Sequence, residues 1–492
     1  MNPHLKRLLA PLSTDLTASL VVFLVALPLC VGVAVASGVP AELGLVTGIV
    51  GGLVTGLLPG SSLQVSGPAA GLTVLVYDAV HEFGLPALGV IVLVTGLLQL
   101  ALGAARLGRW FRAISLSVVQ GMLAGIGLVL IAGQLYALAD AGAPRSGTEK
   151  VAGLGDLAAD TATSSTGLTA MAIGVSTVLI LALWRYLPAR VRTVVPGPLA
   201  AVGASAAATA VFALPINRVE IGGLLTAVSA PHVTDFSRLA EPALLVAVVA
   251  FTLIASAESL FSAAAVDRLH SGPRTDYDKE LMAQGAGNTV CGLLGALPMT
   301  AVIVRSAANV QAGARTKASR VLHGVWLLLF AAMIPAALGV IPTAALAGVL
   351  VHAGWKLLPL REVRTLWRER RGESVVLTVT AVAILVTNMF EGVLLGLLLS
   401  VVKTAWDTSH VHIETTDPGP LAPLMVRIRG NATFLRLPSI LDALDRLPPG
   451  RSVHLDLSGI RHLDHACAQA LQSWVDQHNT AGVRTERRIL RA

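Results

Sequence analysis

Two short stretches of the sequence decide the fold: residues 58–76, LPGSSLQVSGPAAGLTVLV, and residues 293–310, LLGALPMTAVIVRSAANV. Each places proline and small residues ahead of a brief apolar run that is too short for an ordinary membrane span. They fall third and tenth among the apolar segments of the chain, seven segments apart. An odd number of spans per half makes the two halves run in opposite directions. The spacing therefore predicts an inverted-repeat transporter whose discontinuous helices meet at the middle of the membrane.

The composition around these stretches is that of a membrane protein. Of the 492 residues, 54% are hydrophobic and 13% are charged, and the mean hydropathy is +0.72. A soluble globular protein carries about 25% charged residues, so this chain has too little polar surface for a water-soluble body of its length. Residues 89–105 contain no charged residue at all. The sequence predicts an all-α polytopic membrane protein.

Apolar runs and the residues that interrupt them give fourteen segments, arranged as a seven-plus-seven inverted repeat. The predicted segments are 17–37, 41–58, 67–79, 86–105, 112–135, 167–184, 194–213, 242–266, 280–297, 299–312, 318–339, 341–359, 374–389 and 391–407. We expect a cytoplasmic stub at residues 1–14, a transmembrane transporter domain at 15–407, a proline-containing linker at 408–423 and a small α/β tail at 424–492.

The basic residues predict the orientation in the membrane. Alternate loops hold eighteen Lys and Arg residues and the remaining loops hold four, Arg145, Lys150, Arg218 and Arg238. Basic loops stay in the cytoplasm, so both termini are expected there, in a multi-pass protein of a bacterial inner membrane. This clustering also accounts for the net charge of +7, and no nucleic-acid partner is expected. Cys30, Cys291 and Cys467 lack metal-ligand spacing, and no cofactor is expected.

The two decisive stretches predict an anion site. A helix N-terminus presents unpaired amide groups and about half a positive charge, so two such ends facing each other attract an anion without a buried cation. The candidate anion-binding residues are Ser66, Gly67, Ala69 and Ala70 on one side and Thr300, Ala301 and Val302 on the other. The alternative is that these small residues only permit close helix packing.

Glu258 is the candidate coupling residue. It is the one charged residue between Leu244 and Val266. A carboxylate in a membrane span is costly, and beside an anion site it would repel the anion unless it held a proton or a metal cation. Ser262 lies one helical turn on, on the same face. The alternative is a protonated structural Glu that bonds to a neighbouring helix.

Other polar residues in the apolar segments receive simpler interpretations. Arg305 is expected to reach from the tenth segment to the membrane interface, with a role near the site as the alternative. His323 and His352 are expected to be packed in apolar surroundings. Gln284 and Asn288 are expected to bond across helices.

Several runs resemble the SulP anion transporters in order and in topology. They are DLTASLVVFLVALPLCVGVAVASGVP (15–40), QVSGPAAGLTVLV (64–76), ELMAQGAGN (280–288) and LGALPMTAVIVRSAANVQAGART (294–316). The resemblance covers about residues 12 to 407. The tail resembles a shortened STAS domain, in which the turn that often carries a phosphorylatable Ser has Asp464 and His465; a docking or stabilising role is expected for it.

The resemblance implies a core domain and a gate domain, often in a homodimer, that work by an elevator-like movement. In bicarbonate carriers of this family the anion lies between the third and tenth helices, which corresponds here to Ala69, Ala70, Thr300 and Ala301. Their sodium site corresponds to Glu258 and Ser262, with Thr300 nearby. Sodium-coupled members have Asp where this chain has Glu258, so a proton is at least as consistent as sodium. The partners implied are a small inorganic anion, H+ or Na+, and the lipid bilayer.

Other transport functions remain open beside a coupled carrier of sulfate or bicarbonate. An anion exchanger or channel would share these residues. A proton-coupled nucleobase permease would share the architecture but carry a second carboxylate at the tenth segment, where this chain has Met299, Thr300 and Ala301; a dicarboxylate permease is a further alternative. A membrane enzyme would need a clustered nucleophile, base or metal set, which the sequence does not offer.

Overall fold

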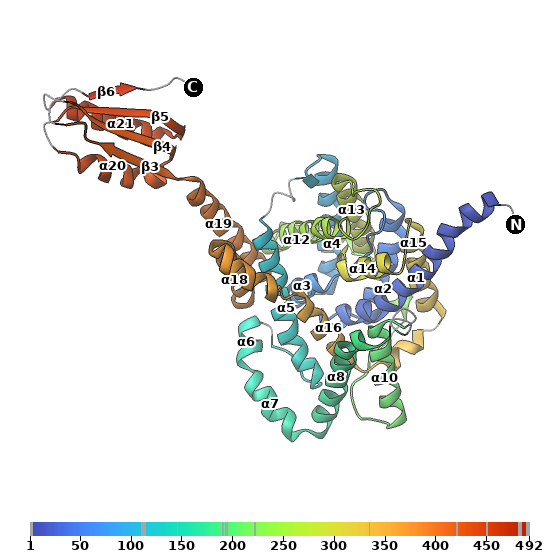
Figure 1. Cartoon of the computed structure of the whole chain (residues 1–492). Helices are drawn as coiled ribbons and strands as arrows, with labels where there is room; N and C mark the ends of the chain where they lie inside the picture. The colour runs from blue at the N-terminus through green and yellow to red at the C-terminus, as the bar shows by residue number, and fades with distance from the viewer. Residues whose placement is uncertain are drawn as a thin grey trace. The chain divides into compact units, whose positions relative to one another are not determined.

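The structure is a computed structural model, and it describes residues 3–109, 115–144, 146–188, 191, 195–220, 223–333, 335–419, 422–448, 451–480 and 485–488. The chain divides into two compact units, Met1–Gly396 and Leu397–Ala492. The elements of both units are labelled in Figure 1. The first unit is helical apart from one pair of very short strands, and the second is a small α/β unit.

Each of the fourteen predicted segments contains a helix. The first half consists of α1 (Pro3–Ala36), α2 (Ala41–Val50) with its π-helical continuation η1 (Gly51–Thr55), α3 (Thr73–Phe83), α4 (Leu85–Ala104), α5 (Leu116–Leu138), α8 (Ser165–Leu183) and α10 (Gly197–Val211). The second half consists of α12 (Pro242–Val266), α13 (Tyr277–Leu293), α14 (Ile303–Gln311), α15 (Ala318–Met333), α16 (Thr343–Leu357), α18 (Arg371–Val386) and α19 (Met389–Thr408). Shorter helices lie between them: α6 (Gly147–Ala152), α7 (Leu154–Thr163), η4 (Trp184–Tyr186), α11 (Leu224–Ala227), η5 (Val233–Ala240), η6 (Pro335–Val340) and α17 (Leu360–Glu369).

The helices differ in how far they reach across a membrane. Among the described residues, seven helices are long and apolar enough to cross a bilayer by themselves. By contrast, α14 has nine residues and extends only about 14 Å, roughly half of the hydrocarbon core. The third and tenth segments are therefore broken spans, as their sequences predict.

The packing of the helices repeats with the two halves exchanged. Helix α4 packs against α13, and in the same way α15 packs against α2. Helix α12 packs against α4, and their counterparts α1 and α15 also pack against each other. Helix α18 packs against α5, and their counterparts α8 and α16 do the same. In each pair of contacts the helices exchange halves and keep their positions within a half, so the seven-plus-seven repeat is visible in the packing itself.

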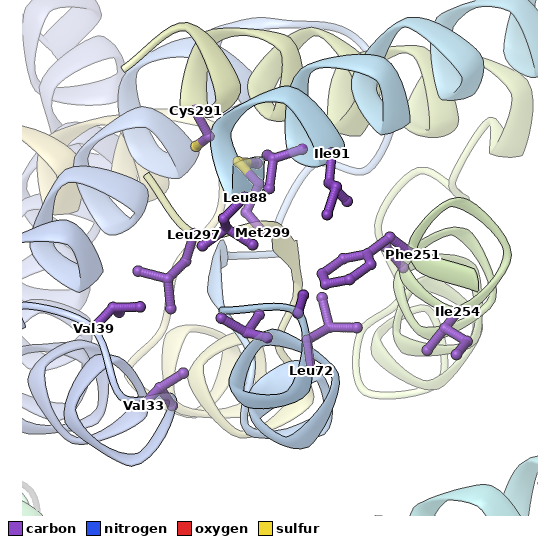
Figure 2. Close-up of a cluster of buried hydrophobic side chains, with 14 of the residues drawn as sticks. Val33, Val39, Leu72, Leu88, Ile91, Phe251, Ile254, Cys291, Leu297 and Met299 are labelled. Atoms are coloured by element: carbon purple, nitrogen blue, oxygen red, sulfur yellow. The ribbon is translucent and has the colours of Figure 1, made fainter. Parts of the chain in front are cut away.

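These contacts separate two sets of helices. Helices α1 to α4 and α12 to α15 form the set that we call the core, and α5, α8, α10, α16 and α18 form the set that we call the gate. Glycines let the core helices approach closely: a Cβ on Gly292 would lie 2.2 Å from the Leu93 amide nitrogen. Figure 2 shows apolar side chains of the core, among them Leu72, Phe251 and Met299, converging from separate segments. The broken segments are thus enclosed by tightly packed helices.

The tail is a four-stranded sheet covered by helices. Its elements are β3 (Val411–Thr416), β4 (Leu424–Ala432), η7 (Phe434–Arg436), α20 (Leu437–Asp445), β5 (Val453–Leu463), α21 (His465–Thr480) and β6 (Thr485–Arg488). The strand order is β3-β4-β5-β6; β3 and β4 are antiparallel, and the other pairs are parallel.

The tail departs from the expected organisation at the linker and contains one additional strand. The predicted linker contains β3, because Val411 and Ile413 pack on the apolar core of the tail while the strand pairs with β4. A further strand, β6, follows α21 and pairs with β5, in a part of the tail for which no element was predicted. Its residues, Thr485–Arg488, are mostly charged and give no apolar alternation, so the signal for a strand is weak.

Candidate functional site

The site is built on two short strands that join the broken segments. Strands β1 (Ser66–Pro68) and β2 (Met299–Ala301) pair antiparallel, with Ser66 opposite Ala301. Strand β1 continues through the 3-10 turn η2 (Ala70–Leu72) into α3, and β2 continues into α14. Because the strands are antiparallel and each runs on into a helix, the two helices begin near each other and run in opposite directions. Their N-termini therefore face a common region.

This arrangement corrects one detail of the sequence prediction. Ser66, Gly67, Thr300 and Ala301 were expected in the first turns of the helices, but they lie in the extended strands. Proline disfavours helical conformation in the residue before it, so Pro68 favours extended backbone at Gly67. The unpaired amides of α14 are those of its first turn, from Ile303 onward.

Helix α13 holds the strands in place through amide side chains. Gln284 Nε2 donates to Ser66 Oγ at 2.7 Å. Asn288 Oδ1 accepts from the Met299 backbone amide at 2.7 Å, and its Nδ2 donates to the Met299 carbonyl oxygen at 3.1 Å. All these residues are buried. Asn288 Nδ2 also donates to Gln99 Oε1 of α4 at 2.8 Å, which confirms the predicted bond across helices for Asn288, whereas Gln284 bonds to a strand of another segment.

A cavity of about 130 Å³ lies between the core and the gate at the start of both short helices. The predicted site residues that line it are Ala69, Ala70, Glu258, Ser262, Ala301 and Val302. Ser66, Gly67 and Thr300 are predicted site residues that do not line it and are buried within the strand pair. The gate contributes Val119 and Met122 of α5 and Val349, His352 and Lys356 of α16.

Glu258 is placed on α12 so that its carboxyl group lies against the first broken segment. A Cβ on Gly71 would be 2.4 Å from Glu258 Oε1, so only glycine permits this approach. The Thr300 hydroxyl interacts with the same carboxyl group. Glu258 Oε2 is buried and has no hydrogen-bond partner in the described part of the chain. The next residue, Ser259, links α12 to the second broken segment, since its Oγ accepts from the Ala301 amide at 3.3 Å.

Arg305 lies at the site, which was the alternative and not the favoured interpretation of its sequence position. It was expected to reach the membrane interface, but its side chain is buried, with 1% exposed, and it lines the cavity. Its Nη2 donates to the Pro68 carbonyl oxygen at 3.2 Å. Its Nε and Nη1 are buried and find no acceptor among the described residues. The signal was its position as the third residue of a nine-residue helix, which places it in the first turn.

His352 is a second departure from the sequence interpretation. It was expected to be packed in apolar surroundings, but it lines the cavity together with Lys356, one helical turn further along α16. His323 on α15 is fully buried, and neither of its ring nitrogens has a hydrogen-bond partner in the described residues. His323 is therefore packed as predicted but without the hydrogen bonds of a satisfied histidine, and His352 lies at the cavity.

The charges around the cavity define what it can hold. Two helix N-termini, the Arg305 guanidinium and Lys356 of the gate contribute positive potential, and Glu258 contributes one carboxylate. A small anion can be stabilised by the amides and the arginine without any metal. The carboxylate opposes that anion unless it is neutralised. Among the described residues, no group of three or more His, Cys, Asp or Glu side chains could hold a metal ion.

Comparisons with known proteins agree with this architecture. Residues 12–380 match the model of the family described as "Sulfate permease family". The protein named "Putative sulfate transporter YvdB" of Bacillus subtilis is 27% identical over 371 residues, which cover 73% of this chain and 68% of that protein.

Two solved structures have the same fold. The transmembrane domain of a cyanobacterium bicarbonate transporter, BicA, aligns with a TM-score of 0.67 and 22% identity, over 79% of this chain and 97% of that one. The murine anion transporter Slc26a9 in the inward-facing state aligns with a TM-score of 0.77 and 15% identity, over 98% of this chain and 86% of that one. The sheet of the tail is compatible with a short STAS domain.

Proposed function

We propose that this chain carries sulfate or bicarbonate by secondary active transport that is coupled to a proton or to sodium. The chain belongs to the sulfate permease family and is an anion transporter of that family. The observation that carries the proposal is the cavity in which two helix N-termini, Arg305 and Glu258 meet. Its volume of about 130 Å³ equals roughly four water molecules at liquid density, which suits an anion of a few heavy atoms.

The anion is held by the core. The cavity is lined by Ala70 and Gly71 of η2, the turn that leads into α3, and by Ile303 to Arg305 in the first turn of α14, so the amides of these two turns are the donors that we assign to the anion. The small side chains of Ala69, Ala70 and Ala301 let the anion approach the backbone. No lysine or arginine other than Arg305 lines the cavity from the core helices in the described residues, so Arg305 and the amides supply the positive potential on that side.

Glu258 couples a cation to the anion. Its buried Oε2 lacks a protein partner, so this oxygen is available to a proton or to a sodium ion. Ser262 and Thr300 offer hydroxyl groups on the same side. Neutralising Glu258 removes its repulsion of the anion, and the anion in turn favours the neutralised form. Both ions therefore enter together as a nearly neutral pair, which is the basis of symport.

Transport then requires the cavity to open alternately to each side of the membrane. The cavity lies between core and gate, and its anion-binding groups belong to the core alone. An elevator-like displacement of the core along the gate would carry the bound ions without rebuilding the site. We place both termini in the cytoplasm on the evidence of the basic loops, and we propose a homodimer in a bacterial inner membrane. Light scattering of the detergent-solubilised chain measures the oligomeric state.

Uptake into proteoliposomes tests the proposal. Radiolabelled sulfate, bicarbonate and fumarate are compared under imposed proton and sodium gradients, with protein-free liposomes as the control. We expect accumulation of one inorganic anion above equilibrium under one of the two gradients. Fast uptake that equilibrates under every gradient would show a channel or an exchanger instead. Preference for fumarate would show a dicarboxylate permease.

A further inference from the structure

Helix α17 is amphipathic and stands apart from the transport site. It connects α16 to α18, with only Leu358 and Pro359 before it and Arg370 after it. Two extended residues reach at most about 7 Å, so each end of α17 lies close to the end of the neighbouring helix. Because α16 and α18 belong to membrane segments, α17 must lie at the membrane surface.

The exposed side chains of α17 form two adjacent rows. Leu360 and Trp367 are seven residues apart, share one side of the helix and are 55% and 54% exposed. Arg361, Arg364 and Arg368 form the next row, and all three are exposed. An apolar row therefore runs alongside a basic row, and both rows are exposed in the described part of the first unit.

The remaining faces of α17 set the orientation of these rows. Val363 and Leu366 are partly buried and lie on the side away from the arginines. Glu362 and Glu369 are exposed and lie beyond the arginine row, on the side farthest from Trp367. Going around the helix, the protein-facing side, the apolar row, the basic row and the acidic row follow in turn.

The arginines of α17 have no anionic partner in the described part of the chain. The ion pairs found there join other residues, and none includes Arg361, Arg364 or Arg368. Three uncompensated guanidinium groups beside exposed Trp and Leu match a membrane interface, where phosphates lie above the acyl chains. Trp355, near the end of α16, is also 59% exposed, as is typical of interfacial tryptophans.

We propose that α17 lies in the membrane interface and binds the head groups of anionic phospholipids. Leu360 and Trp367 enter the boundary between head groups and acyl chains, and Arg361, Arg364 and Arg368 contact the lipid phosphates. The acidic row then faces water. The lipid surface is favoured over a protein partner because the chain already holds the helix against it. The proposal does not depend on which anion the site carries.

Fluorescence quenching of Trp367 tests this binding in the full chain. The protein is reconstituted in nanodiscs that contain brominated phosphatidylglycerol in one sample and brominated phosphatidylcholine in another. Bromine quenches tryptophan only at short range, and the difference between the parent protein and Trp367→Phe isolates Trp367 among the seven tryptophans. We expect stronger quenching of Trp367 by the phosphatidylglycerol probe, weakened at high salt.

Charge variants of α17 show whether the arginines cause this preference. In the triple variant R361Q/R364Q/R368Q, the preference for the anionic probe at Trp367 should fall at least about twofold, and R364Q alone should lower it less. The matched control E362Q/E369Q changes the acidic row and should keep or increase the preference. Equal quenching by both lipids in the parent protein, or an unchanged preference in a monodisperse triple variant, would overturn the proposal. The single variant gives the same answer should the triple variant fail to fold.

Discussion

The two broken segments are built alike and equipped differently. Each consists of a short strand, a turn or single residue, and a short helix, and the strands pair with each other. From Ser66 to Tyr77 the first segment has no charged residue, whereas the second carries Arg305 in the first turn of its helix. The first segment instead meets a charge from outside, because Glu258 lies against Gly71. The backbone thus supplies two equivalent helix starts, and the side chains distinguish them: an arginine lies at one and a carboxyl group at the other.

Filling the cavity should have the largest effect, because residues of both broken segments and Glu258 line it. Ala301→Leu adds three carbon atoms to a side chain that is 1% exposed and lines the cavity. We expect uptake to fall by about a hundredfold, in line with the cost of overpacking a buried site. Ala204→Leu on the exposed face of α10 is the matched control. Near-normal uptake by well-expressed Ala301→Leu protein would argue against an anion held by the backbone here.

Replacing the Glu258 carboxyl group alone should separate ion coupling from anion binding. Glu258→Gln imitates the protonated carboxyl group, so the anion should still bind, and exchange of labelled for unlabelled anion should continue. Accumulation against a gradient should fall at least about tenfold, because no group is left to carry the coupled ion. Exchange and gradient-driven uptake are measured in the same proteoliposomes. Unchanged accumulation with the same cation dependence would make Glu258 structural.

Replacing Gly71 or Gly67 by alanine tests the surroundings of Glu258 and of Arg305 separately. A Cβ on Gly71 would lie 2.4 Å from Glu258 Oε1, and a Cβ on Gly67 would lie 2.2 Å from Arg305 Nη1. Gly71→Ala should therefore weaken the cation dependence of uptake, and Gly67→Ala should raise the anion concentration for half-maximal uptake by a few-fold to about tenfold. Both are measured as uptake against anion and cation concentration. Identical kinetic changes in the two variants would contradict the division of roles.

The smallest effect on transport is expected in the tail. Asp464 Oδ1 accepts from the Cys467 amide at 2.8 Å and so caps the N-terminus of α21. Loss of such a cap costs about 1 kcal/mol, so Asp464→Ala should speed hydrogen exchange of the α21 amides about fivefold. Asp442→Ala on the exposed side of α20 is the control. The ranking of transported anions should not change, and a change would show that the tail acts on the site.

The sequence predicted the segments well because lipid leaves one solution for the backbone. Long apolar runs become helices, and the buried amide side chains of Gln284 and Asn288 had to find partners in other segments. Conformation at the breaks was harder, because the strand pair depends on contact between residues more than 200 positions apart. Arg305 was misjudged for a related reason: its distance from the interface depends on how short α14 is, and that boundary appears only in the structure.

The β1–β2 pair also constrains how this chain could have diverged from an ancestral duplication. Side chains along a strand alternate between its two faces, so an insertion or deletion of one residue in either strand would turn its side chains to the opposite face. Such a change would carry Ser66 away from Gln284 and Ala301 away from the cavity. Substitutions are free of this penalty. The two repeats could therefore drift apart in chemistry, one acquiring an arginine and the other a neighbouring carboxylate, while remaining locked in length.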